Sequence, residues 1–172
     1  VLFLAYMYYH LPDVSTLTNI TYKEPLKVFT SQGDLITEFG QVHRIPAKIN
    51  EIPKLFLQAL VVTEDQRFYE HHGVDPIGIA RAASSLFLTR QKRQGASTIT
   101  MQVARNFFLS SEKTYLRKIN EVLLAIAIEK NLSKEDILEL YCNKIFLGQR
   151  AYGVKAAARN YFGKKLDELT LA

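Results

Sequence analysis

The 172-residue sequence contains a single cysteine, Cys142. This excludes an intrachain disulfide and a zinc site built from several cysteines, so the hydrophobic core has to provide the stability. Long apolar runs are also missing. The first eleven residues, VLFLAYMYYHL, are apolar over about ten positions, whereas roughly 20 are needed to span a bilayer. Because the sequence begins at Val1, we interpret residues 1–12 as the end of a membrane anchor or a membrane-proximal segment, with a buried strand or helix as the alternative.

Composition predicts one globular domain with an anionic partner. Hydrophobic residues make up 48% of the chain, enough for one sizeable core, and there is no internal repeat or low-complexity tract. The formal net charge is +5 and the calculated pI is near 9.3. A nucleic acid, an acidic membrane surface and a phosphorylated substrate all fit this charge.

The chain is predicted to be mainly α with a small β element near its start. Between Pro25 and Pro46 the alternation of apolar and polar residues around Gln32-Gly33-Asp34 predicts a short β-hairpin, within an N-terminal extension over 13–50. Beyond Pro53 the spacing of apolar residues becomes helical. The first predicted helix ends near Glu64, the second begins at Pro76, and the third runs from about Ser97 to Phe108. The fourth begins near Thr114 and contains an all-apolar stretch over 122–128 that predicts burial. The fifth begins after the Ser133 cap, and the sixth lies within 148–163.

The stretch EDQRFYEHHG, residues 64–73, is the first candidate site. Glu64 follows an apolar run and lies beside aromatic residues, a setting that disfavours the charged carboxylate and suits proton transfer. A capping carboxylate with surface histidines is the alternative. A metal site is a further alternative, since Glu64, Asp65, His71 and His72 are ligand types, but no HExxH pattern is present.

The stretch GASTITMQVARN, residues 95–106, is the second candidate site. A glycine and hydroxyl residues begin a helix, where free backbone N–H groups favour an anion. Thr98, Gln102 and Arg105 follow at i, i+4 and i+7 and form one polar stripe. An ordinary N-cap followed by a solvated helix face is the alternative.

The third candidate site comprises Arg117, Lys118 and Glu121, which share a helix face one turn before the apolar stretch. A surface ion pair is the alternative, worth about 0.3 to 0.5 kcal/mol. Two carboxylates combined with phosphate-type donors suit glycosyl transfer from a phosphorylated donor, in which one carboxylate deprotonates the attacking hydroxyl and cations stabilise the departing phosphate.

At these residues the sequence resembles the peptidoglycan glycosyltransferases of family 51, the strand-polymerising domains of class A penicillin-binding proteins and their monofunctional relatives. EDQRFYEHHG resembles the first motif of that family, GASTITMQ the second, RKINE the third, and the segment from Lys134 to Ala158 the fourth. The departures are Met101, where glutamine is usual, and Arg105, where lysine is usual. In the first two motifs the matching positions are Glu64, Asp65, Phe68, His72, Gly73, Gly95, Ser97, Thr98, Ile99, Thr100 and Gln102.

The resemblance implies a lysozyme-like, mainly α glycosyltransferase domain over 51–172 with a small membrane-proximal lobe. The final LTLA resembles the opening of a fifth motif, so we expect the remainder of the domain, and a transpeptidase domain after it, in the parent protein. The catalytic domain is expected on the outer, periplasmic face of the bacterial inner membrane. The apolar residues of LFLT, 86–89, followed by the cationic segment RQKRQ, 90–94, would suit an anionic membrane surface.

The resemblance also implies chemistry. The substrate is lipid II, Glu64 is the general base, and Glu121 with Arg117 and Lys118 serves the pyrophosphate, with Mg²⁺ or another divalent cation on Glu121 as a possible cofactor. Moenomycin is the expected inhibitor, and no nucleic acid is needed. The implied substrate-binding residues are Asp65, Phe68, His72, Gly73, Gly95, Ser97, Thr98, Gln102, Arg105, Asn106, Lys113, Arg117 and Lys118.

Two alternatives from other functional classes remain open on the sequence. A muramidase-like hydrolase would use Glu64 with water as acceptor, but it leaves Arg117 and Lys118 without a role. A non-catalytic, membrane-associated scaffold would bind glycan or lipid without turnover.

Overall fold

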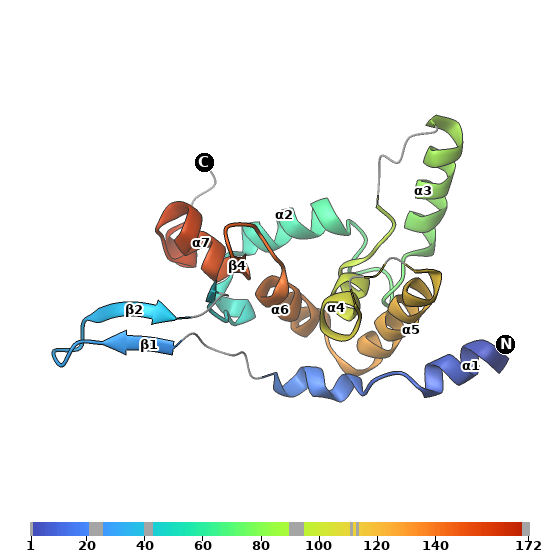
Figure 1. Ribbon diagram of the computed structural model, residues 1–172. Coiled ribbons are helices and arrows are strands. Elements are labelled where there is room, and N and C mark those ends of the chain that lie inside the picture. Colours follow the sequence, from blue (N-terminus) through green and yellow to red (C-terminus); the bar gives the residue numbers. More distant parts are fainter. Residues whose placement is uncertain are drawn as a thin grey trace.

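Helices predominate in the computed structural model, which describes residues 2–20, 26–39, 43–89, 95–110, 112 and 114–169 (Figure 1). The prediction of a mainly α chain with a short N-terminal hairpin is confirmed. The α-helices are α1 (Leu2–Tyr9), α2 (Lys54–Glu64), α3 (Pro76–Thr89), α4 (Ile99–Phe108), α5 (Tyr115–Asn131), α6 (Lys134–Lys144) and α7 (Val154–Phe162). The short elements are the strands β1 (Leu26–Phe29), β2 (Leu35–Phe39), β3 (His43–Arg44) and β4 (Ala151–Tyr152) and the 3₁₀ helices η1 (Val14–Asn19), η2 (Ile49–Glu51) and η3 (Leu166–Glu168).

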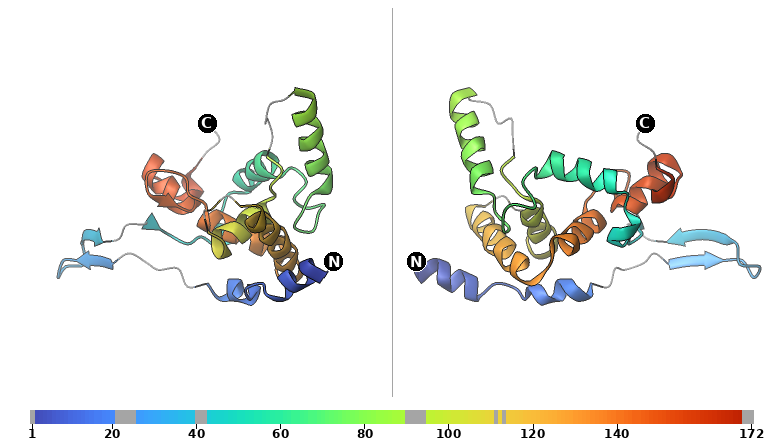
Figure 2. Two further views of the ribbon diagram at one scale, coloured as in Figure 1. Left: turned by 45° about the vertical axis from the view of Figure 1, so that its right-hand side comes forward. Right: turned by 180° about the vertical axis from the view of Figure 1, so that it is seen from behind.

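The predicted hairpin is formed by β1 and β2, which pair antiparallel with Val28 opposite Thr37. Its turn is closed by the Thr30 N–H, which donates to the Asp34 carbonyl at 2.7 Å. Gly33 has a φ of 94°, which glycine adopts without steric cost. The hairpin projects away from the helices in all three views (Figures 1 and 2).

Local signals place the helix boundaries close to their predicted positions. Helix α2 follows Pro53 and ends at Glu64, and α3 begins at Pro76. Helix α4 begins two residues later than predicted, because the Thr98 hydroxyl caps it by accepting from the Met101 N–H at 3.1 Å. Helix α6 begins with the predicted cap, in which Ser133 and Asp136 bond each other's backbone N–H groups.

The hydrophobic core lies where α4 packs between α5 and α6. Ile99 and Val103 of α4, Leu124 and Ile128 of α5, and Ile137 of α6 are fully buried. Burying an aliphatic side chain of this size stabilises a fold by roughly 1.5 to 3 kcal/mol. These three helices therefore form the rigid base on which the neighbouring loops rest.

The all-apolar stretch of α5 is buried on one side only, which corrects the prediction of a helix buried all round. Leu124 and Ile128 face α4, whereas Val122, Leu123 and Ile126 are partly exposed. The short elements α1 and η1 contact α5 outside the core, and their length lets them cover only part of its other side.

Helix α6 also fastens the segment that leads into α2. The Asn143 side chain accepts from the Ala47 N–H and donates to the Ala47 carbonyl, both at 2.8 Å and both buried. One turn earlier, Glu139 accepts from the Ile49 N–H at 2.8 Å. These bonds satisfy backbone groups that would otherwise be buried without partners, so α6 fixes the start of α2.

No helix in the part of the chain that the structure describes is long and apolar enough to cross a bilayer. Helix α1 has eight residues, and three exposed tyrosines, Tyr6, Tyr8 and Tyr9, lie along it. The assignment of residues 1–12 to a membrane anchor stays a prediction.

Cys142 should resist alkylation in the folded protein. The thiol is fully buried, and burial raises its pKa from 9.0 to about 12. A shift of 12 − 9 = 3 pH units lowers the thiolate population about a thousandfold near neutral pH. We expect iodoacetamide to leave the folded chain unmodified and to label one site in urea, as measured by intact mass; rapid labelling without denaturant would contradict the burial.

Candidate active site

Glu64 stands at the C-terminal end of α2, where its side chain is exposed. Its Oε2 accepts a hydrogen bond from the Gln102 amide nitrogen of α4 at 2.9 Å. The carboxylate borders a hollow of about 460 Å³ between the end of α2, the start of α3 and the segment leading into α4. Helix α3 stands apart from the other helices beyond that end of α2 (Figures 1 and 2). Ser97, Arg105 and Arg81 also line the hollow, so a carboxylate and cations face one space.

A larger hollow of about 800 Å³ lies elsewhere, between η2, α7 and η3. Its charged groups include Glu51 and Lys155, which pair with each other at 3.2 Å. None of the site residues predicted from the sequence lines it. The smaller hollow therefore carries the candidate chemistry.

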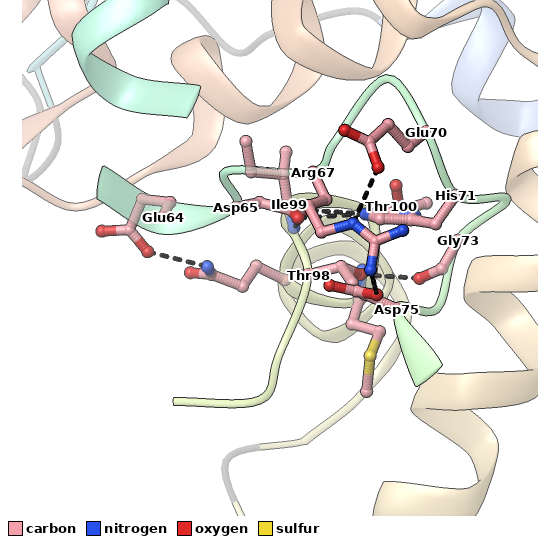
Figure 3. A network of polar contacts seen from close by, with 12 residues as sticks. Glu64, Asp65, Arg67, Glu70, His71, Gly73, Asp75, Thr98, Ile99 and Thr100 are labelled. Atoms are coloured by element: carbon pink, nitrogen blue, oxygen red, sulfur yellow. Dashed lines mark hydrogen bonds and ion pairs between the residues drawn. The ribbon is translucent and has the colours of Figure 1, made fainter. Parts of the chain in front are cut away.

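Asp65 turns inward from Glu64 and forms a buried pair with His71 (Figure 3). The His71 Nε2 lies 2.9 Å from Asp65 Oδ2, and the same oxygen accepts from the Ile99 N–H at 3.0 Å. A free N–H at the first turn of a helix is well satisfied by a carboxylate. The pair thereby fixes the start of α4 against the loop that follows Glu64.

Gly73 joins that loop to two helices at close range. The Thr98 hydroxyl donates to the Gly73 carbonyl at 2.6 Å, beside the start of α4. On the other side, a Cβ added to Gly73 would lie 2.6 Å from the Ala125 carbonyl oxygen of α5. Its φ of 91° is also one that residues with a side chain rarely adopt. The position requires glycine on both grounds.

Gly73→Ala should therefore destabilise the fold by about 2 to 4 kcal/mol, through backbone strain and a contact that the α5 backbone has to relieve. Gly163→Ala is the matched control, since Gly163 has a φ of 64° and no atom within 4 Å of the added Cβ. We expect the control to lose only about 1 kcal/mol. Urea unfolding of both variants measures the difference, and equal losses would contradict the close approach to Ala125.

Below the loop, a buried network joins α4, α5 and α6. The Lys134 ammonium donates to Glu129 and to the His71 carbonyl, each at 2.7 Å, and lies 4.3 Å from the centre of the Phe68 ring. Glu129 accepts a further bond from the Thr100 hydroxyl at 2.6 Å. These contacts pair a largely buried charge and hold the loop from its inner side.

The far end of the loop positions α3. The Arg67 guanidinium donates to Glu70 at 2.8 Å and contacts the buried Asp75 at 3.3 Å, and the hydrogen bond to Glu70 is the largest cause of the raised pKa of Arg67. Asp75 in turn accepts from the Ile77 N–H at 3.1 Å, in the first turn of α3. A carboxylate at this place stabilises the helix start.

Glu121 is fully buried beneath two cations of its own helix. Its Oε1 accepts from Lys118 at 2.6 Å and its Oε2 from Arg117 at 3.0 Å, as the i,i+3 and i,i+4 spacing predicted. Lys118 also donates to the Ser97 hydroxyl at 2.8 Å, and Ser97 lines the hollow. The ammonium of Lys118 therefore connects Glu121 with the edge of the hollow.

This arrangement does not fit a divalent cation held by the protein. Both carboxylate oxygens of Glu121 already accept from cations. Nowhere in the described ranges do three acidic, histidine or cysteine side chains gather as a metal site would require. The Mg²⁺ expectation stays a prediction.

The comparisons with known proteins decide the family. The family model described as Transglycosylase matches residues 32–172. This chain belongs to the transglycosylase family. Penicillin-binding protein 1A of Escherichia coli K12 is 56% identical over 94% of the chain, and that of Vibrio cholerae is 54% identical over 98%. The chain spans only 19% and 20% of these two relatives.

A solved structure also matches. The crystal structure of penicillin-binding protein 1A from Haemophilus influenzae aligns with 88% of this chain and 13% of its own, at 28% sequence identity and a TM-score of 0.33.

In this transglycosylase domain the hollow brings together part of the predicted site. The predicted residues that line it are Glu64, Asp65, Gly95, Ser97, Thr98, Gln102 and Arg105, and Lys118 reaches it through Ser97. Asn106 is partly buried and does not line it. Lys113 and residues 90–94 lie outside the described residues.

The predicted substrate contacts of this loop stay predictions. Asp65, Phe68 and Thr98 are buried and hold the loop and the start of α4, and Asp65 and Thr98 also line the hollow. His72 is exposed, whereas its neighbour His71 is buried and bonded to Asp65. A loop that turns Asp65 inward can present only one of two adjacent histidines to it.

Sequence reasoning missed several residues that shape the site. Arg81 lines the hollow from α3, and Asp75, Arg67 and Lys134 position the surrounding elements. Asp75 could have been found, because an aspartate directly before a proline at a helix start is a typical N-cap pattern. The others depend on contacts between distant parts of the chain.

Proposed function

We propose that this transglycosylase domain polymerises lipid II into β-1,4-linked glycan strands. The observation that carries the proposal is the hollow itself, which combines the exposed Glu64 carboxylate with a cationic side reached by Lys118 through Ser97. Such a pairing serves a reaction in which a hydroxyl attacks and a pyrophosphate departs.

Glu64 would take the proton from the 4-hydroxyl of the acceptor. The hydroxyl oxygen then forms a bond to the anomeric carbon of the growing chain with inversion, and the bond from that carbon to the pyrophosphate oxygen breaks. Undecaprenyl pyrophosphate leaves with the electron pair, and Lys118 and Arg117 compensate its charge. Glu121 holds these two cations in place, and its predicted catalytic role stays a prediction.

The proposal also includes the parent protein, its location and its inhibitor. Relatives named penicillin-binding protein 1A are about five times as long as the chain, which supports a parent protein with a transpeptidase domain. We place the domain on the periplasmic face of the inner membrane, against an anionic lipid surface. Moenomycin would compete for the same hollow.

Incubation of the chain with labelled lipid II tests the proposal. A ladder of growing glycan on a gel, together with undecaprenyl pyrophosphate detected by mass spectrometry, is the expected result. Cleavage of preformed glycan without release of that lipid would instead establish a muramidase-like hydrolase. Binding of lipid II with no product under any condition would favour a scaffold.

A further inference from the structure

We propose that the buried Tyr141 hydroxyl orients the Gln102 amide and, through it, positions the Glu64 carboxylate for proton transfer. This inference rests on the proposed function for the role of Glu64. The hydroxyl of Tyr141 in α6 donates to Gln102 Oε1 at 3.4 Å, and Gln102 Nε2 donates to Glu64 Oε2 at 2.9 Å. Two side-chain hydrogen bonds in sequence thus link three helices, α6, α4 and α2, beside the hollow.

The two hydrogen bonds that lead from Tyr141 through Gln102 to Glu64, called the relay below, depend on the two unlike ends of an amide. A side-chain amide offers donors on its nitrogen and only acceptors on its oxygen. If the Gln102 amide turned by half a rotation, its oxygen would face the Glu64 carboxylate, and two acceptors would meet. A donor on the far side, the Tyr141 hydroxyl, selects the orientation in which the nitrogen faces Glu64.

Tyr141 is well placed to remain that donor. Its side chain is 1% exposed, and desolvation, followed by the negative charge of Glu64, raises the pKa of its hydroxyl well above the usual value, against the opposing effect of Arg105. The hydroxyl therefore keeps its proton at neutral pH. Tyr141 is not among the described residues that line the hollow, so it acts as a positioning residue.

The orientation of Gln102 affects the two carboxylate oxygens of Glu64 differently. Gln102 holds Oε2, while among the described residues no donor is bonded to Oε1. Fixing one oxygen sets the direction of the other, which is free to accept the proton of the acceptor hydroxyl. General-base efficiency depends on such placement within hydrogen-bond reach of the proton.

A double-mutant cycle tests this dependence. Tyr141→Phe removes one buried oxygen, and Gln102→Met removes both polar ends of the amide at similar volume. With labelled lipid II, we expect Tyr141→Phe to lower kcat by roughly threefold to tenfold with KM unchanged, which is the range of one hydrogen bond. In the Gln102→Met background the same change should have no further effect.

The matched control is Tyr161→Phe. The Tyr161 hydroxyl donates to the Leu147 carbonyl at 2.7 Å, away from the hollow, so its removal should leave kcat unchanged. An unchanged kcat in Tyr141→Phe would overturn the proposal. So would an equal fold-loss with and without the Gln102 amide, since Tyr141 would then act by another route.

A second measurement needs no active enzyme and no hydroxyl deletion. With 3-fluorotyrosine at position 141, we expect the ¹⁹F signal to shift when Glu64→Gln or Gln102→Met is introduced, while 3-fluorotyrosine at 161 does not respond. No shift at 141 would overturn the relay. If the chain makes no glycan yet the signal shifts, the relay stands and the proposed function fails.

Discussion

Glu64→Gln should reduce the polymerisation of lipid II by roughly a hundredfold to ten-thousandfold, the range over which a general base contributes to rate. The amide keeps the size of the carboxylate but cannot accept the proton of the attacking hydroxyl. The fold should remain intact, because Glu64 is exposed at the end of α2 and its described side-chain contact is the single bond from Gln102. Initial rates of glycan formation and a circular-dichroism melt measure the two effects separately.

Glu70→Gln is the matched control. It makes the same change of charge on the loop that follows Glu64, at an exposed carboxylate that is paired with Arg67 and does not line the hollow. Its rate should equal that of the parent, and its stability should change by about 0.5 kcal/mol or less. If Glu64→Gln formed glycan strands of normal length, Glu64 would not be the general base. If its circular-dichroism melt showed loss of the folded state, Glu64 would be a structural residue.

The helices could be predicted because their boundaries depend on residues that are close together in the sequence. Ser133 and Asp136 form their cap three residues apart, and Pro53 and Pro76 precede or begin helices as proline commonly does. The cations on Glu121 were predictable for the same reason, since i,i+3 and i,i+4 neighbours share a helix face. In these cases the partner lies within one or two turns along the chain.

The residues that hold the site together could not be predicted in this way. Glu64 and Gln102 meet across 38 residues, and Asn143 and Ala47 across 96, so each bond depends on how whole helices pack. The adjacent His71 and His72 are chemically identical in sequence, and only the path of the loop decides that His71 meets Asp65.

A residue that belongs to a family motif does not have to contact the substrate. Phe68 and Thr98 lie within motifs that resemble a substrate site, yet both are buried in the scaffold of the loop. Thr98 lines the hollow at the start of α4, whereas Phe68 does not line it. A motif residue can therefore serve the chemistry by holding Glu64 and the start of α4 in place, which requires no contact with substrate.

Glu121→Gln should cost about 3 to 5 kcal/mol of folding free energy, the usual effect of removing one partner from a buried ion pair. The Arg117 side chain is only 17% exposed and would keep its charge without the opposite charge of Glu121, whereas Lys118, at 43%, can turn toward water. We also expect polymerisation to fall, because Lys118 would no longer be held against Ser97 at the edge of the hollow. Urea unfolding and initial rates on lipid II measure both losses.

The double variant Arg117→Met/Glu121→Met separates the structural role of Glu121 from a chemical one. Replacing both buried charges with apolar side chains leaves no buried unpaired ion, because Lys118, at 43% exposure, can turn toward water. Stability should therefore return to within about 1 kcal/mol of the parent. Activity should stay low, because one of the two cations proposed to compensate the pyrophosphate is gone. Glu135→Gln, an exposed carboxylate in the first turn of α6, is the control and should leave both quantities unchanged. If Glu121→Gln kept full stability but lost activity, Glu121 would act on the substrate itself, and its burial beneath Arg117 and Lys118 would have to open during the reaction.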